Sequence, residues 1–293
     1  MSKELQLAQE RVNRLKSSRY REVHAKSATW TGDESLNGKR VILYCEQGNG
    51  DTIQFLRYLP QLIAMGCEIV AHANSSLHVL FRHFGIEKCL GWQDQIPEHD
   101  FHVLMLDLPF LFLKNKPTIQ WWWEGTHRES YMPEIMTNLP LPPYLNYDQT
   151  ENLETEGLKI GIAWEGNPVN PGNEYRCCPL KYFQNLPGSL FCLQRDVFLP
   201  NLYEGWEREL LGVKIENYFD TARLINSLDL VITVDTSILH LAGALNKRTF
   251  GLLGYNHDPR WADSLTTPWY PSIRFFRNRN GWDKVFKAIK KLI

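Results

Sequence analysis

One stretch of the sequence, residues 231–244, changes abruptly from a continuous apolar run to a run of small and apolar residues at an Asp-Thr-Ser turn. A short apolar run predicts a buried strand, and Asp235 or Thr236 can cap a helix that begins near Ser237. Strands that lead directly into helices are the units of parallel α/β sheets. The free N–H groups at the start of such a helix favour an anion, and His240 follows one turn later. Helix capping and local packing of His240 are the alternative interpretation.

The remainder of the chain repeats this alternation, which predicts parallel βαβ units. We expect strands at 40–45, 67–72, 101–106, 158–164, 189–194, 213–216, 229–234 and 248–253, and helices at 52–65, 76–84, 180–186, 220–227, 237–245 and 282–293. Ligands of open parallel sheets bind beyond the carboxyl ends of the strands, so two such halves with facing strand ends predict a ligand cleft.

The length of the chain, 293 residues, exceeds the size at which a single hydrophobic core usually keeps growing, so two domains are expected. Apolar residues at helical spacing (Leu5, Ala8, Val12 and Leu15) among charged and polar ones predict a helix at 3–24, which forms an N-terminal segment, 1–38, with its connector. The proline-rich region at 109–157 predicts the boundary between an N-terminal α/β domain, 39–150, and a C-terminal one, 151–293.

The net charge does not indicate a class of partner, because the chain has 32 basic and 33 acidic residues and a formal net charge of −1. This excludes a strong global attraction to nucleic acid or to an anionic membrane, although a local basic patch is compatible with it. Six cysteines without a C-x-x-C pair predict free, buried thiols in a reducing compartment and no metal site. Without a signal-type or membrane-spanning apolar run, we expect a cytoplasmic protein.

A second strand-to-helix turn follows the strand at 40–45 and reads Gln47-Gly48-Asn49-Gly50-Asp51. Its two glycines let another molecule approach the backbone. The third glycine of a dinucleotide fingerprint is replaced by Ile53, so an NAD-dependent oxidoreductase is disfavoured. Asp51 is either a plain helix cap or a carboxylate that accepts a proton from an attacking hydroxyl.

Further polar residues follow the strands of the second half. The strand at 158–164 ends in a turn that contains Trp164 and Asn167. Arg176, shortly afterwards, is either a cation that neutralises a diphosphate or an exposed loop charge. Gln194 ends another strand and either reads the edge of a nucleobase or caps the sheet. The sequence leaves both alternatives open.

Four ordered segments carry a resemblance to a known family: 46–60, 163–168, 234–245 and 268–272. Together they resemble the glycosyltransferase-like domain that follows tetratricopeptide repeats in many bacterial proteins. That domain is similar to the ADP-heptose:lipopolysaccharide heptosyltransferases of glycosyltransferase family 9. The resemblance covers roughly residues 28–290.

The resemblance implies a GT-B fold, in which two Rossmann-like α/β domains face a central cleft. It implies an inverting, metal-independent glycosyltransferase with no cofactor beyond a nucleotide-sugar donor, and an acceptor that is a glycan, a protein or a nucleic acid. The N-terminal domain would bind the acceptor through Gln47, Gly48, Asn49 and Gly50, with Asp51 as the base. The C-terminal domain would bind the donor through Trp164, Asn167, Arg176, Gln194, Asp235, Thr236, Ser237 and His240.

Several positions depart from the family pattern: Asn49 replaces a leucine, Arg176-Cys177-Cys178 replaces an Arg-Ser-aliphatic run, and residues 255–257 replace a proline-rich turn. These changes surround the expected cleft. They favour an alternative of a different class, a non-catalytic module that keeps the fold to bind a nucleotide or a glycan. The sugar, the nucleobase, the acceptor and the oligomeric state stay open.

Overall fold

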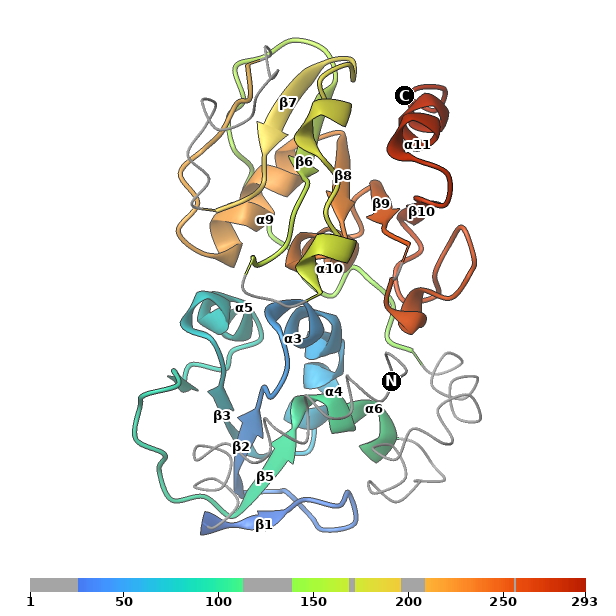
Figure 1. The fold of residues 1–293 in the computed structure, drawn as a ribbon. Coiled ribbons are helices and arrows are strands. Elements are labelled where there is room, and N and C mark those ends of the chain that lie inside the picture. Colours follow the sequence, from blue (N-terminus) through green and yellow to red (C-terminus); the bar gives the residue numbers. More distant parts are fainter. Residues whose placement is uncertain (1–25, 113–138, 169–171, 196–208, 256) are drawn as a thin grey trace. The chain divides into compact units, whose positions relative to one another are not determined.

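A computed structural model describes residues 26–112, 139–168, 172–195, 209–255 and 257–293. The chain divides into two compact units, Met1–Pro140 and Leu141–Ile293, and each contains one five-stranded sheet (Figure 1). The backbone N–H groups of Tyr144 and Leu145 donate to the Ala244 carbonyl, at 3.2 and 3.4 Å, which ties this stretch to the second unit. The helix expected at 3–24 lies outside the described residues. The division into an acceptor domain and a donor domain stays a prediction.

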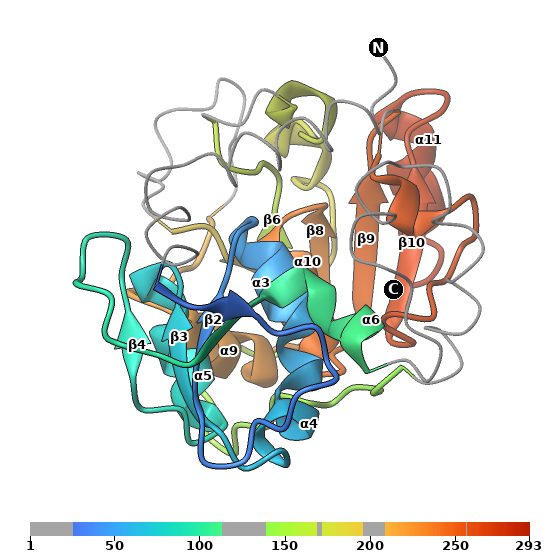
Figure 2. The same cartoon turned by 90° about the horizontal axis from the view of Figure 1, so that it is seen from below.

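The first unit is built on a parallel sheet with the strand order β1-β5-β2-β3-β4, part of which is visible in Figure 2. Its strands are β1 (Ala28–Thr29), β2 (Arg40–Tyr44), β3 (Glu68–His72), β4 (Cys89–Leu90) and β5 (Phe101–Leu104). Its helices are α3 (Asn49–Phe55), α4 (Leu59–Ile63), α5 (His78–His83) and α6 (Leu108–Leu111). The apolar runs of β2, β3 and β5 are buried in the sheet, as their sequences predict.

The helix expected at 52–65 differs from the prediction, because it begins at Asn49 and is divided. A 3₁₀ turn, Leu56–Tyr58, separates α3 from α4. Pro60 lies in the first turn of α4, where its missing N–H costs nothing, whereas inside one continuous helix it would remove a backbone hydrogen bond. The buried guanidinium of Arg57 donates from Nε to the Gln54 carbonyl at 2.8 Å and so satisfies an acceptor near the break.

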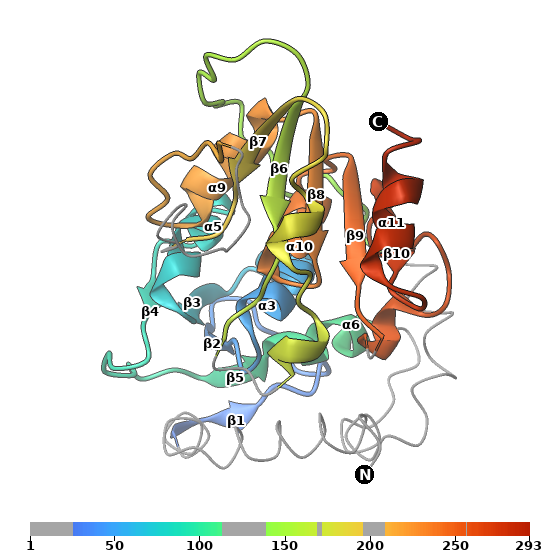
Figure 3. The same cartoon turned by 45° about the horizontal axis from the view of Figure 1, so that its top comes forward.

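The second unit has a parallel sheet with the strand order β10-β9-β8-β6-β7. Its strands are β6 (Lys159–Ala163), β7 (Ser189–Cys192), β8 (Leu230–Val234), β9 (Thr249–Leu253) and β10 (Ile273–Arg277), and its helices are α9 (Tyr218–Ser227), α10 (Ser237–Ala244) and α11 (Trp282–Ile289). Every residue of β8 and β9 is buried, in keeping with their mostly apolar sequences, which Thr233 and Thr249 interrupt. The order β9-β8-β6 places the carboxyl ends of these three strands side by side at one edge (Figure 3).

Two expected elements of this unit are wrong. No strand forms at 213–216: the chain pairs with β7 only around Leu211, whose N–H donates to the Leu190 carbonyl at 2.9 Å. The N–H groups of Glu216 and Asn217 then donate to the Asp220 carboxylate that caps α9, so they are not available to a strand ladder. The helix expected at 180–186 is reduced to a 3₁₀ turn, Leu180–Tyr182, ahead of the Pro-Gly pair at 187–188.

The edge strand β10 was not expected from the sequence. Its residues read Ile-Arg-Phe-Phe-Arg, and the two arginines interrupt the apolar pattern. Arg274 is exposed, whereas the guanidinium of Arg277 donates to the carbonyls of Trp261 and Ala262, at 3.1 and 2.6 Å. Arg277 is therefore compatible with a strand because neighbouring loop carbonyls satisfy its charge.

Candidate functional site

The turn between β8 and α10 has the geometry of an anion-binding helix start. Thr236 is the N-cap of α10, and its hydroxyl accepts a hydrogen bond from the Ile238 N–H at 3.3 Å. The Leu239 N–H donates to the Thr236 carbonyl at 3.0 Å. Among the residues that the structure describes, neither the N–H nor the hydroxyl of Ser237 has such a partner, and Ser237 is half-buried. Ser237 thus presents two donors at the positive end of a buried helix.

Asp235, directly before this cap, is a buried carboxylate rather than a surface ligand. Its side chain accepts a 2.9 Å hydrogen bond from the indole N–H of Trp261. Burial raises the pKa of Asp235, and the nearby carboxylate of Asp258 raises it further, whereas Arg176, Arg260 and the Trp261 hydrogen bond oppose the shift. Asp235 therefore fixes the turn through its hydrogen bond to Trp261, and its charge is coupled to that of Arg176.

His240 lies one turn into α10, as expected, and is buried. Its Nδ1 is 3.0 Å from the Tyr270 hydroxyl, and its ring packs against the rings of Trp261 and Tyr270, at centroid distances of 5.4 and 5.8 Å. The Tyr144 hydroxyl lies 3.4 Å from that of Tyr270. This chain of contacts fixes the orientation of the imidazole.

The turn after β6 lies beside the β8 turn. A Cβ at Gly166 would lie 2.7 Å from Asn173 Oδ1 and 3.5 Å from the Thr236 methyl group, so glycine permits this close approach. The Gly166 N–H donates to Asn173 Oδ1 at 3.0 Å, and the Arg176 N–H donates to the Asn173 carbonyl at 2.9 Å. Asn173 therefore joins the β6 turn to the loop that carries Arg176.

The guanidinium of Arg176 is half-buried and makes no hydrogen bond or ion pair within the described part of the chain. Its loop is held against the end of β9, because a side chain at Gly254 would collide with the Tyr175 carbonyl. The positive charge of Arg176 acts to lower the pKa of Asp235, before the cap of α10. A cation and two Ser237 donors thus share one edge of the sheet.

The other three expected donor residues lie in different environments. Trp164 is buried in the hydrophobic core of the unit, where its ring packs among core residues. Gln194 accepts hydrogen bonds from the N–H groups of Trp164 and Glu165, at 2.7 and 3.0 Å, so its amide oxygen caps the end of β6. Asn167 is exposed on the β6 turn. Trp164 and Gln194 therefore support the turn after β6, the first by packing in the core and the second by hydrogen bonds to the backbone.

In the first unit, the Gly-rich turn follows β2 and opens α3. Gly48 is the N-cap, and Asp51 is the third residue of the helix. A Cβ at Gly48 would lie 3.5 Å from Asp51 Oδ2, so the half-buried carboxylate lies over the cap. Gln47, Asn49 and Gly50 are also half-buried. The structure thus brings all five residues of this turn together at the carboxyl end of β2.

Three residues that support these turns were missed in the sequence: Asn173, Trp261 and Tyr270. Trp261 and Tyr270 contact residues 26 and 30 positions away, so no local spacing connects them with their partners, whereas Asn173 lies seven residues from Gly166. The segment 268–272 was noted for its Pro-Trp-Tyr-Pro pattern, and this signal could have identified Tyr270 as a packing partner of α10. A Cβ at Gly243 of α10 would lie 2.4 Å from the Tyr270 ring.

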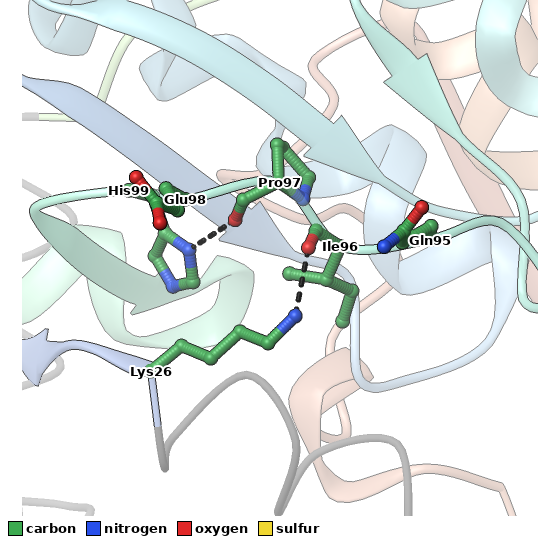
Figure 4. A pocket seen from close by; sticks show the side chains of 6 residues that line it. All are labelled: Lys26, Gln95, Ile96, Pro97, Glu98 and His99. Atoms are coloured by element: carbon green, nitrogen blue, oxygen red, sulfur yellow. Dashed lines mark hydrogen bonds between the residues drawn. The ribbon is translucent and has the colours of Figure 1, made fainter.

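The cysteines, the possible metal ligands and a pocket of the first unit do not add a second site within the described residues. The six cysteines are free thiols. No group of three His, Cys, Asp or Glu side chains within the described residues could hold a metal ion. Figure 4 shows a pocket in the first unit where Lys26 Nζ donates to the Ile96 carbonyl at 2.8 Å and His99 Nδ1 lies 2.9 Å from the Pro97 carbonyl. This pocket precedes β5 at the amino edge of the sheet, opposite to the edge at which open parallel sheets bind ligands.

Sequence comparison connects the second unit with a known family. The model of glycosyltransferase family 9 (heptosyltransferase) matches residues 217–292, which contain α9, α10 and α11. Protein FlbA of Caulobacter vibrioides (strain ATCC 19089 / CIP 103742 / CB 15) is 24% identical over 278 residues, which are 84% of this chain. The chain spans 44% of the length of FlbA.

Solved structures of glycosyltransferases share the fold. TibC from enterotoxigenic E. coli H10407, an iron-containing dodecameric glycosyltransferase, aligns with a TM-score of 0.54 at 12% identity, over 88% of this chain and 74% of its own. TibC in complex with ADP-D-beta-D-heptose gives 0.55 at 14%, over 85% and 65%. The family 9 glycosyl transferase from Veillonella parvula DSM 2008 gives 0.54 at 14%, over 89% and 92%.

These matches confirm the predicted α/β fold of GT-B type, and the chain is similar to glycosyltransferases both in this sequence segment and in its fold. None of the described helices has the length and apolar character that would let it span a bilayer.

Proposed function

We propose that this protein is an inverting glycosyltransferase that moves a sugar from a nucleoside-diphosphate donor to an acceptor hydroxyl without help from a metal ion. The observation that carries the proposal is an uncommitted guanidinium, that of Arg176, at the same sheet edge as the unpartnered donors of Ser237 at the start of α10, within the described residues. The segment that contains α10 is also the one that matches the glycosyltransferase family 9 model.

The donor diphosphate would bind at this edge of the second sheet. During transfer the bond between the anomeric carbon and the diphosphate oxygen breaks, and negative charge grows on the leaving diphosphate. Arg176, the Ser237 N–H and the hydroxyls of Thr236 and Ser237 stabilise that charge, as a divalent cation does in other transferases. Asp235 and His240 hold these donors in place through Trp261 and Tyr270. Removal of one such donor typically lowers the rate by about 10²–10³-fold.

The acceptor would bind at the Gly-rich turn of the first unit. The carboxylate of Asp51 takes the proton of the acceptor hydroxyl as its oxygen attacks the anomeric carbon, so one C–O bond forms while another breaks and the nucleoside diphosphate leaves. Gln47 and Asn49 flank this carboxylate and offer amide groups to a polar acceptor. Attack from the side opposite to the leaving group inverts the anomeric centre.

ADP sugars are the first donors to test, because TibC is a heptosyltransferase that has been crystallised with ADP-D-beta-D-heptose. The acceptor is a glycan, a protein or a nucleic acid. The tetratricopeptide-repeat context, the absence of a cofactor other than the donor and a cytoplasmic location stay predictions.

A thermal-shift panel tests the donor site directly. ADP, GDP, UDP, CMP, their sugar conjugates and NADH are added to the full chain, where a ligand at 100 times its dissociation constant adds about 2.7 kcal/mol of stability. We expect one nucleoside diphosphate to stabilise the protein selectively, and Arg176→Gln to lose most of this shift. Arg279→Gln is the matched control, because Arg279 is an exposed arginine of the same unit that is paired with Asp263.

Turnover separates a transferase from a binding module. We expect the protein to release nucleoside diphosphate when the stabilising donor is offered with a panel of acceptors, and to do so equally well in excess EDTA. Nucleotide binding without release for any acceptor would contradict the transferase and support the non-catalytic module. Loss of release in EDTA would contradict metal independence alone.

A further inference from the structure

The second unit carries a basic surface around α11 that the proposed reaction does not use. Four places contribute exposed cations to it: the turn before β7, the residue before β9, the edge strand β10, and α11 with the turn that follows it. We name the following set the α11 basic surface: Lys181, Arg248, Arg274, Lys284, Lys287, Lys290 and Lys291.

Ring contacts and a hydrogen bond bring these segments together. The Tyr182 ring stacks on Phe286 of α11, with centroids 5.8 Å apart, and Lys181 Nζ lies 5.4 Å from the Tyr182 ring centroid. Arg248 donates from Nη2 to the Leu292 carbonyl, just beyond α11, at 2.8 Å. Figures 1 and 3 show α11 lying against the side of the sheet formed by β9 and β10. One continuous face therefore carries the cations.

Helix α11 is amphipathic, and its lysines share the outer face. Its buried residues, Trp282, Val285, Phe286 and Ile289, pack into the core cluster of the unit. Lys284 and Lys287 lie three residues apart on one side of α11, and Lys291 follows in the turn just after its last residue, Ile289. The spacing directs this whole row of lysines toward solvent.

The lysines are not neutralised by their neighbours. Within the described residues, none of the four lysines from Lys284 to Lys291 forms an ion pair or hydrogen bond through its side chain. Asp283 is the single acid in the sequence segments 180–189, 246–249 and 270–293, which form the surface. The helix dipole accounts for lysines in the last turn, but Lys284 lies in the first turn, where the dipole opposes a cation. The surface is thus more basic than helix stability requires.

The chain as a whole has a formal net charge of −1, so this face is a local excess of positive charge on a nearly neutral molecule. Such an asymmetry orients a protein on an anionic partner, whereas a high net positive charge would favour non-specific binding.

The side chains between the cations favour lipid over nucleic acid. Single-stranded nucleic acid stacks its bases on exposed aromatic rings. Here the rings of Phe250 and Phe276 are buried, and the guanidinium groups of Arg248 and Arg274 lie over them, at 5.3 and 5.7 Å from the ring centroids. Leu292, in contrast, is an exposed apolar side chain next to Lys290 and Lys291. Lysines around an apolar side chain suit the interface of a bilayer.

We propose that the α11 basic surface binds membranes that contain anionic lipid. Arg248 directly precedes β9, so its bond to Leu292 places the far end of α11 at the amino edge of the sheet. The donor site proposed above lies at the carboxyl edge. The α11 basic surface and the proposed donor site share no residue, so either proposal can fail alone.

Vesicle co-sedimentation of the full chain tests this surface. We expect binding to phosphatidylcholine vesicles that contain phosphatidylglycerol and none to pure phosphatidylcholine, with loss of binding as salt rises from about 0.1 M to about 0.5 M. The variant K284Q/K287Q/K291Q should bind about a hundredfold more weakly, since each lysine near an anionic bilayer contributes about fivefold.

The matched control is K39Q/K88Q/K214Q, which removes three exposed lysines that are paired with Asp100, Glu68 and Glu216. It changes the net charge by the same amount and should bind vesicles like the unmodified chain. Circular dichroism verifies that both variants fold. Equal loss of binding in both triple variants, no binding of the unmodified chain to anionic vesicles, or preferential binding to an RNA or DNA oligonucleotide would overturn the proposal.

Discussion

The indole N–H of Trp261 donates a 2.9 Å hydrogen bond to the buried carboxylate of Asp235. The two residues are separated by 26 positions in the chain, and the bond joins the loop before β10 to the turn that starts α10. The charges of Arg176 and Arg260 also act on Asp235. The Trp261 hydrogen bond therefore fixes a carboxylate that is electrostatically coupled to the cation of the site. The donor site is thus supported by residues that never need to touch the donor.

Replacing Trp261 by Phe should destabilise the protein by about 1–3 kcal/mol, because the Asp235 carboxylate then loses a buried donor. Urea denaturation measures this change. Trp282→Phe is the control, since Trp282 is buried in the same unit but none of its described contacts is a side-chain hydrogen bond. An equal loss of stability in both variants would show that the Trp261 effect comes from the smaller ring and not from the lost hydrogen bond.

Tyr270→Phe removes the hydroxyl beside His240 Nδ1 and leaves the packing of the ring in place. We expect weaker binding of the stabilising nucleotide, by about tenfold, with a smaller effect on folding, since one hydrogen bond contributes about 1 kcal/mol. Calorimetric titration provides the affinity. Tyr182→Phe, at a ring that stacks on Phe286 of α11, should leave it unchanged; a decrease there of the same size would contradict an orienting role for Tyr270.

Local pattern predicted the strands and turns of this fold well because the decisive signals are local. The apolar run of β8, the Thr236 cap and the glycine pair before Asp51 each lie within a few residues of the feature that they specify. The same holds for the amphipathic spacing of α11, although the helix ends at Ile289 and not at the end of the chain.

The parts that sequence reasoning missed depend on contacts between distant segments. The strand β10 is stabilised by loop carbonyls that satisfy Arg277, which its own sequence does not reveal. For Trp164 and Gln194 a donor role stays a prediction: the Trp164 ring lies in the core, and the Gln194 amide oxygen accepts from backbone N–H groups, which is the capping alternative that the sequence left open. Residue type alone does not distinguish a side chain that lines a site from one that supports it.

Replacing Gly243 by Ala should destabilise the second unit by about 1–3 kcal/mol, because the new methyl group would lie 2.4 Å from the Tyr270 ring and the core must move. Thermal denaturation detects the change. Gly48→Ala provides the comparison, since its Cβ would meet Asp51 Oδ2 at an ordinary 3.5 Å. If Gly243→Ala were as stable as Gly48→Ala, the close packing of α10 on Tyr270 would be wrong.

Asp51→Asn should abolish sugar transfer while nucleotide binding and stability stay near those of the unmodified chain, because the change removes a proton acceptor from the acceptor side only. Release of nucleoside diphosphate and the thermal shift are measured on the same preparation. Asp283→Asn changes an acid in the first turn of another helix and should transfer normally. Normal turnover in Asp51→Asn would remove this residue from the mechanism.

The buried thiol of Cys192 should make the second unit sensitive to alkaline pH. Burial raises its pKa from 9.0 to about 11, so the folded protein holds the thiol proton more tightly than the unfolded chain. This contribution is therefore complete below pH 9 and is lost as the pH rises through about 11, at about 1.4 kcal/mol for each pH unit.

Denaturation between pH 8 and about pH 11 tests this linkage. Cys192→Ala should lower stability at pH 8, because it leaves a cavity, but its free energy of unfolding should fall less steeply above pH 9 than that of the unmodified chain. Other groups that titrate in this range are common to both proteins, so the difference between the two slopes isolates Cys192. Parallel slopes would show that the thiol ionises as readily in the folded state as in the unfolded one.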